Sequence, residues 1–263
     1  MARTTGKLAG RAALITGGGT GIGRGIALRF VREGAAVALC GRREGPLAGA
    51  CAEIESAGGR CVVLQGDIGV EADVRRIVAG AAAALGGLDV LVNNASVVGQ
   101  VGPVEVLDLG RWNEALAVNL GGAMLCCREA IPHLKRGGGT IVNISSNVGR
   151  RGFRNRAPYV CAKWALHGLT QTLALELAGS GVRINAVCPG PVLTERLLGS
   201  MEEMAAARGI TSAEVQREWE AESPMGRFAT VEECAQVTLF LACDDSSAMT
   251  GQALNVTAGV IMS

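Results

Sequence analysis

Two side chains that could transfer a proton lie four residues apart in the second half of the chain. Tyr159 is the one tyrosine among 263 residues, and Lys163 is one of three lysines. Leucines at positions 166, 169, 173 and 177 predict a helix over residues 157–179, whose spacing places the phenol and the ammonium on one face. A tyrosine ordinarily ionises near pH 10, and a unit charge about 4 Å away contributes roughly 4 kcal/mol at an effective dielectric of about 20. We therefore expect a phenol with a lowered pKa; the alternative is a half-buried tyrosine beside a solvated lysine.

A glycine-rich turn follows the first predicted strand, residues 11–16, and precedes a helix that extends to about Glu33. Glycines let the backbone approach a pyrophosphate closely, and the amides and dipole of a helix N-terminus favour its negative charge. Such turns also occur for steric reasons alone, but the position after the first strand favours a dinucleotide site. The residues expected to bind the cofactor here are Gly17, Gly19, Thr20, Gly21, Ile22 and Gly23.

The second predicted strand, residues 35–40, ends at Gly41 and Arg42, where the adenosine ribose would lie in such a fold. An acidic residue here would bind the 2′-hydroxyl of NAD, and none is present. Arg42 offers a planar cation for the 2′-phosphate of NADP. The sequence therefore favours NADP(H), with NAD(H) and a solvated Arg42 as the alternative.

Strands alternate with helices along the chain. Further strands are predicted at 61–65, 88–92, 140–144 and 183–187, and helices at 71–85 and 111–134. This pattern predicts an α/β fold: one domain, residues 1–263, with a doubly wound, Rossmann-like parallel sheet of about seven strands and helices on both faces. Ligands gather beyond the carboxyl ends of such strands, where Asp67, Ile68, Asn94 and Ala95 follow the third and fourth strands. The alternation breaks at residues 195–228, which we expect to be a substrate lid; a surface excursion or a subunit contact is the alternative.

Composition excludes several classes of function. The net charge of +1 and pI of about 7.5 give no field for nucleic acid or an acidic membrane surface. No apolar segment reaches 18 residues and no signal-peptide core forms, so a cytoplasmic protein without membrane partners is expected. The nine cysteines, without a CxxC pair, are expected to be reduced, and His133 and His167 are too isolated for a metal site. Hydrolase chemistry lacks a GxSxG motif.

The chain resembles the short-chain dehydrogenase/reductase family from about Lys7 to Met262. The resemblance rests on TGxxxGIG at 16–23, Asn93-Asn94-Ala95, Asn119, Ser146, the YxxxK pair and Pro189-Gly190. It implies hydride transfer between a nicotinamide and a carbonyl or alcohol carbon. Tyr159 would be the general acid or base, Ser146 would polarise the carbonyl, Lys163 would bind the ribose and lower the tyrosine pKa, and Asn119 would hold a water of a proton relay. The carboxamide would be positioned by Pro189, Gly190, Val192 and Thr194, and the family usually forms homotetramers.

The substrate is less well defined by the sequence. The resemblance implies a mainly apolar pocket, and its expected lining comprises Ser146, Asn147, Val148, Phe153, Tyr159, Val97, Val98 and Pro191, with Leu197, Leu198 and Met201 from the lid. Arg150, Arg151, Arg154 and Arg156 crowd the loop before Tyr159, where a substrate carboxylate or phosphate, or a solvated or intersubunit loop, would explain them. We expect an NADP-dependent reductase of a small ketone. The alternatives are an NAD-dependent alcohol or polyol dehydrogenase and a non-catalytic nucleotide-binding regulatory protein.

Overall fold

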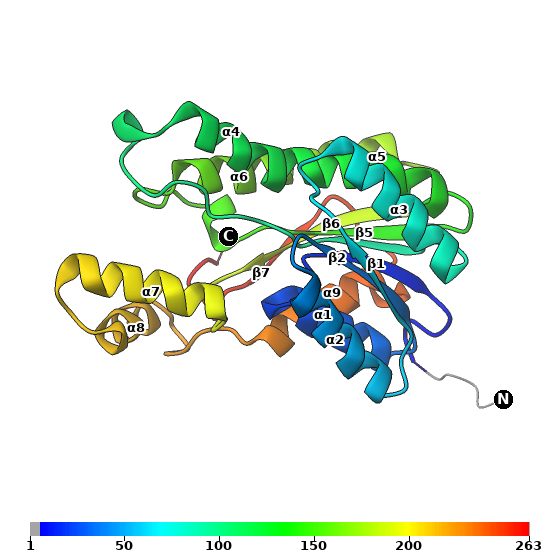
Figure 1. Ribbon diagram of the computed structural model, residues 1–263, viewed down its shortest axis with the longest axis horizontal. Helices are drawn as coiled ribbons and strands as arrows, with labels where there is room; N and C mark the ends of the chain where they lie inside the picture. Colours follow the sequence, from blue (N-terminus) through cyan, green and yellow to red (C-terminus); the bar gives the residue numbers. More distant parts are fainter. Residues whose placement is uncertain (1–5, 263) are drawn as a thin grey trace.

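A single parallel sheet organises the molecule. The computed structural model describes residues 6–262, and its sheet has seven strands in the order β3-β2-β1-β4-β5-β6-β7 (Figure 1). Every neighbouring pair is parallel, which confirms the predicted doubly wound α/β fold. The strands are β1 Ala12–Thr16, β2 Ala36–Gly41, β3 Cys61–Gln65, β4 Val90–Asn93, β5 Gly139–Ile144, β6 Val182–Pro189 and β7 Ala253–Val256.

Helices cover both faces of this sheet. Figure 1 shows α3 to α6 over one face and α1, α2 and α9 over the other. The helices are α1 Gly21–Arg32, α2 Glu44–Ser56, α3 Glu71–Leu85, α4 Leu109–Leu116, α5 Gly122–Leu134, α6 Ala157–Glu176, α7 Glu195–Arg208, α8 Ser212–Ala221 and α9 Val231–Ala242. The apolar runs of the strands follow from this layering, since strands covered on both faces need no polar side.

Strand β1 shows how the two cores form. Its alternate residues Ala13 and Ile15 belong to the core beneath α1, α2 and α9. Leu14 lies in the other core, beneath α3 and α5. Because successive side chains of a strand point to opposite faces, one short segment contributes to both cores.

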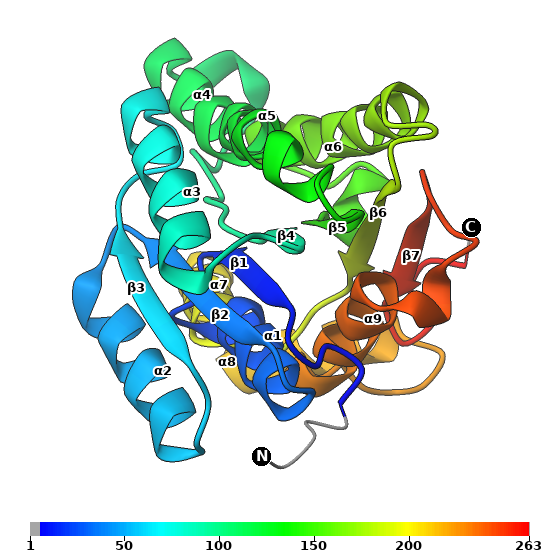
Figure 2. The same ribbon diagram turned by 90° about the vertical axis from the view of Figure 1, so that its right-hand side faces the viewer.

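Two elements differ from the sequence-based expectation. The segment 111–134 is not one regular helix: a π-helical turn, Ala117–Gly121, separates α4 from α5. The seventh strand, β7, was not located from sequence because its four residues are all only partly buried and carry no periodic pattern. Figure 2 shows β7 at one edge of the sheet and β3, beside α2, at the other.

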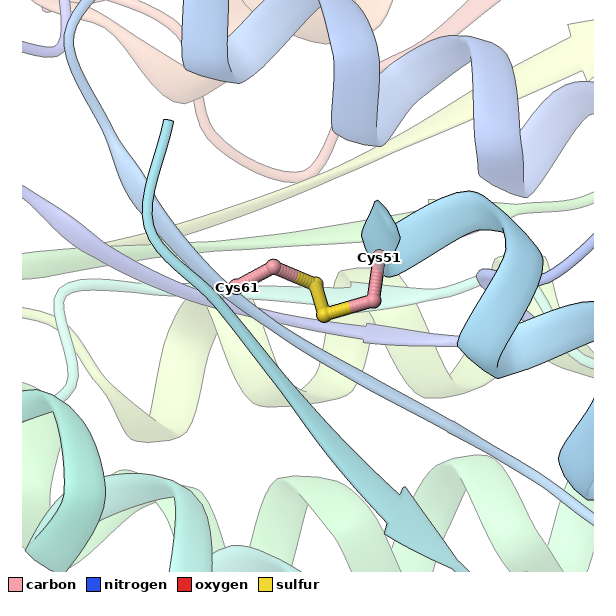
Figure 3. The surroundings of a disulfide bond; sticks show 2 residues. All are labelled: Cys51 and Cys61. Carbon is pink, nitrogen blue, oxygen red and sulfur yellow. A yellow bond between two sulfur atoms is a disulfide. The ribbon is translucent and has the colours of Figure 1, made fainter. Parts of the chain in front are cut away.

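The expectation that every cysteine is reduced is wrong for one pair. Cys51 of α2 and Cys61 of β3 form a disulfide, with their Cα atoms 5.5 Å apart (Figure 3). The chain returns from α2 into the adjacent β3 within a few residues, which brings the two side chains together. The other seven cysteines are free.

Helices α7 and α8 form a separate projection beside the sheet (Figure 1). Met201 and Ala205 of α7 pack against Val215 of α8 and against Phe228. Thr194 caps α7 by accepting a hydrogen bond from the Leu197 amide, and Thr211 begins α8 with a capping box. Among the described residues, no helix is long and apolar enough to cross a membrane.

Candidate active site

One large cavity opens at the carboxyl ends of the strands. Its volume is about 1010 Å³, and its walls come from the segments that follow β1 to β7. Most residues predicted to bind cofactor line it: Gly17, Gly19, Thr20, Gly21, Ile22, Arg42, Asp67, Ile68, Asn94, Ala95, Tyr159, Lys163, Pro189, Gly190, Val192 and Thr194. Gly23 and Asn119 do not line it; both are buried behind its wall. Within the described chain, no cluster of His, Cys, Asp and Glu could hold a metal ion.

The glycine turn has no room for side chains. Gly17 has a φ of +65°, a conformation that favours glycine. A Cβ on Gly23 would lie 2.3 Å from the Gly17 carbonyl oxygen and 2.4 Å from the Asn94 Nδ2. The Asn94 amide in turn donates hydrogen bonds to the carbonyls of Thr16 and Gly17, at 2.9 and 3.1 Å. Asn94 therefore braces the turn, and the backbone that lines the cavity at the start of α1 fits a pyrophosphate.

The adenosine end of the cavity holds a cation that is not fully neutralised. Arg42 follows β2, and 63% of its side chain is exposed. Its Nη1 lies 3.9 Å from Asp67 Oδ2, a long, solvent-exposed pairing that contributes little energy. The guanidinium can therefore reach a phosphate in the cavity without breaking a strong contact.

Tyr159 and Lys163 lie on α6 and line the cavity. Lys163 is 2% exposed, and its Nζ donates a hydrogen bond to the Ile144 carbonyl at 2.7 Å. Burial alone would raise the pKa of Tyr159, but the charges of Lys163 and Arg196 and a hydrogen bond with Ser146 outweigh it, so that the pKa lies below its ordinary value. The pKa of Lys163 is also lowered, because burial disfavours its charge. The pair thus has the electrostatics of a proton donor and acceptor.

The two serines at the end of β5 have different partners. The hydroxyl of Ser146 donates to Asn147 Oδ1 at 3.0 Å and accepts from the Val148 amide. Ser145 donates to the Lys163 carbonyl at 3.0 Å and contacts His167 Nε2 at 2.9 Å. Of the two serines, Ser146, the one chosen from sequence, makes a hydrogen bond with Tyr159.

Asn119 lies in the π-helical turn and uses its amide locally. Its Oδ1 accepts from the Val97 amide and its Nδ2 donates to the Val97 carbonyl, both at 2.8 Å. These bonds hold the segment after β4 against α4 and α5. The structure shows this bracing contact, whereas the expected water relay remains a prediction.

The substrate end is apolar on one side and charged on the other. Val97, Val98, Asn147, Val148, Phe153, Pro191 and Leu197 line it as expected. Leu198 and Met201 do not, because Leu198 is exposed and Met201 is buried between α7 and α8. Sequence reasoning missed Arg196, Trp219, Glu222 and Val260, which also line the cavity. Only Arg196 could have been suspected from sequence, because it follows Thr194, a predicted cofactor-binding residue, by two positions.

The chain is similar to known proteins over nearly its whole length. The family described as enoyl-(acyl carrier protein) reductase matches residues 17–261. A 2-(S)-hydroxypropyl-CoM dehydrogenase from Xanthobacter autotrophicus is 38% identical over 251 residues, covering 94% of each chain. A D-beta-hydroxybutyrate dehydrogenase from Rhizobium meliloti is 37% identical, covering 95% of this chain and 98% of its own.

A solved structure is similar over nearly the whole chain. The crystal structure of a variant actinorhodin polyketide ketoreductase with NADPH superposes with a TM-score of 0.91 and is 34% identical, covering 95% of this chain and 97% of the ketoreductase. Fold, site and relatives together show that this chain belongs to the short-chain dehydrogenase/reductase family of oxidoreductases.

Proposed function

We propose that the protein interconverts a small ketone and its secondary alcohol with NADP(H). The observation that supports this most is that Tyr159, Ser146 and Lys163 line the same cavity as the glycine turn. This arrangement supports a proton donor and a dinucleotide site that share one cavity. The chain would act as one cofactor-binding and catalytic domain, residues 1–263, with residues 195–228 as its lid.

Each residue has a distinct part in the proposed reaction. The nicotinamide cofactor supplies or accepts the hydride. In the reducing direction the Tyr159 phenol donates its proton to the carbonyl oxygen while the Ser146 hydroxyl donates a hydrogen bond to that oxygen. Lys163 stabilises the phenolate that remains, and a water held near Asn119 would return a proton to it. In the oxidising direction the phenolate accepts the alcohol proton.

The choice of NADP(H) rests on Arg42. Its exposed guanidinium at the end of β2 suits a 2′-phosphate, and the similar ketoreductase was crystallised with NADPH. The carboxylate of Asp67, 3.9 Å away, favours the alternative, NAD(H), because it could accept from a ribose hydroxyl instead.

The names of the relatives support a substrate with a hydroxyl or keto group. They include a hydroxypropyl-CoM dehydrogenase, a hydroxybutyrate dehydrogenase and a polyketide ketoreductase. A homotetramer is also part of this proposal, since the large apolar side chains Leu109, Met124, Trp164 and Leu175 of α4, α5 and α6 are exposed. Light scattering of the purified protein would measure its mass in solution.

A substitution of Tyr159 by Phe tests the chemistry. Turnover of ketones with NADPH should fall by about 10²- to 10⁴-fold, the usual contribution of a general acid. The affinity for NADPH, measured by the quenching of tryptophan fluorescence, should change little. Turnover that survives in this variant would exclude the proposed role, and parallel titrations with NADPH and NADH identify the preferred cofactor.

A further inference from the structure

Three arginines line the substrate end of the cavity, and their surroundings differ. They are Arg151, Arg156 and Arg196, and the carboxylates lining this end are Glu195 and Glu222. Arg151 donates to Glu222 Oε2 at 3.2 Å, so this pair is neutral. Of the charged residues that line this end, Arg156, Arg196 and the buried Lys163 then remain with one carboxylate, Glu195. The substrate end of the cavity therefore carries net positive charge.

Arg156 has no strong partner of its own. Its side chain makes no hydrogen bond or ion pair with any residue that the structure describes, and it is only partly exposed. Burial lowers its pKa, and the more distant charges of Glu203 and Tyr159 oppose that effect. A partly desolvated guanidinium without a protein partner has donors free to bind an anionic ligand.

Arg196 is oriented toward the catalytic pair. Its Nη1 donates to the Ser96 hydroxyl at 2.9 Å and to the Ser96 carbonyl at 3.3 Å, which fixes the side chain across the end of β4. From there its charge acts on both Tyr159 and Lys163. The remaining donors of a planar guanidinium are suited to bidentate contact with an oxyanion.

We propose that Arg156 and Arg196 form an anion-binding subsite beside Tyr159, so that the substrate is a keto acid or hydroxy acid with a carboxylate or sulfonate. The carbon chain would lie along Val97, Val98 and Phe153 on the apolar wall. This inference rests on the proposed function, since it places the anion relative to a carbonyl held at Tyr159. Of the four arginines in the loop before Tyr159, only Arg156 belongs to this subsite. Arg150 donates to the Ala253 carbonyl, Arg151 pairs with Glu222, and Arg154 is exposed and does not line the cavity.

Kinetics on matched substrates test the subsite. The 3-, 4- and 5-oxo acids, the corresponding oxo sulfonates and the methyl esters of the acids would each be reduced with the preferred cofactor. We expect at least one anion to exceed its neutral counterpart in kcat/KM by tenfold or more, and the carboxylate and sulfonate series tell the two acids apart. Wild-type enzyme that reduces the esters as well as the anions would overturn the inference and leave the proposed function intact.

Variants then assign the preference to the two arginines. Arg156→Met and Arg196→Met should each lower the anion-to-ester ratio by roughly tenfold to hundredfold, the effect of losing a hydrogen bond to a charged group. Using the ratio removes effects on Tyr159, which both substrates share. Arg154→Met, on the same loop, and Arg217→Met, on α8, are the controls, since neither lines the cavity. An equal loss in the controls, or an unchanged ratio in both test variants, would contradict the subsite.

Binding measurements keep the two proposals apart. Calorimetry of the cofactor-loaded protein with pentanoate and with pentanamide should show binding of the anion alone, weakened by either test variant. Pentanoate that binds in this way to a protein that reduces no carbonyl would refute the proposed function but not the subsite.

The alternative position for Arg196 is a contact with the cofactor phosphates. Weaker NADPH binding by Arg196→Met without substrate, by tenfold or more, would assign Arg196 to the cofactor site and refute its part in the subsite.

Discussion

The ammonium of Lys163 lies 5.5 Å from the centroid of the Tyr159 ring, one turn further along α6. Both side chains project from the same helix, and the hydrogen bond from Lys163 to the Ile144 carbonyl ties the ammonium to the end of β5. The charge is therefore held near the phenol. The charge of Lys163 is the largest of the effects that lower the pKa of Tyr159, ahead of Arg196 and Ser146.

The pH dependence of alcohol oxidation should report that pKa. The phenolate is the base in this direction, so kcat/KM falls as the pH drops through the pKa of Tyr159. Arg196→Met removes one of the charges that lower this pKa, so the acidic limb of the pH profile of kcat/KM should move to higher pH. A neutral secondary alcohol is the substrate of choice because it avoids the proposed anion subsite. The same limb in wild type and variant would show that Arg196 does not act on the phenol; Arg217→Met is the control.

Arg42 should decide between the two cofactors. Arg42→Ala is expected to weaken NADPH binding by about tenfold to hundredfold, the effect of losing a charge-assisted hydrogen bond, and to leave NADH binding nearly unchanged. Asp67→Asn should instead strengthen NADPH binding, because it removes the carboxylate 3.9 Å from Arg42. Fluorescence titration with both cofactors measures this, with Arg32→Ala on α1 as the control. Equal losses for both cofactors in Arg42→Ala would contradict a contact with the 2′-phosphate.

Gly23 in the glycine turn and Gly49 in α2 should respond in opposite ways to one added methyl group. Gly23→Ala places a Cβ 2.3 Å from the Gly17 carbonyl oxygen, so the turn must shift, and we expect a loss of about 1 to 3 kcal/mol in unfolding free energy with weaker cofactor binding. Gly49→Ala in α2 meets nothing within 4 Å and should stabilise the protein by roughly 0.5 to 1 kcal/mol. Urea denaturation measures both. A neutral Gly23→Ala would show that the turn adapts freely.

The disulfide between Cys51 and Cys61 should be visible in a thiol count. The denatured, unreduced protein should titrate seven thiols, the number of free cysteines. Replacing both cysteines by alanine should lower the unfolding free energy by about 2 to 4 kcal/mol, because the link no longer restricts the unfolded chain. Cys161→Ala, an exposed free cysteine, is the matched control. Nine titrated thiols without reductant would mean that the bond is absent.

Local patterns were sufficient for much of this protein. The alternation of strands and helices predicted the parallel sheet, because each short apolar run reflects burial on both faces. The spacing of Tyr159 and Lys163 predicted a pair on one helical face, since i and i+4 are neighbours in any α-helix. The glycine turn was predictable because its steric requirement is met within seven consecutive residues.

Contacts between distant segments were decided only by the tertiary structure. Arg196 meets Ser96 across 100 positions of sequence, and nothing local to either residue signals that contact. Both polar atoms of the Asn119 amide are taken up by Val97, and Leu198 and Met201 turn away from the cavity because α7 packs on α8. Residue types and near spacing determined which chemistry is available; the packing of segments far apart determined which side chains surround Tyr159, because cavity walls form only when those segments meet.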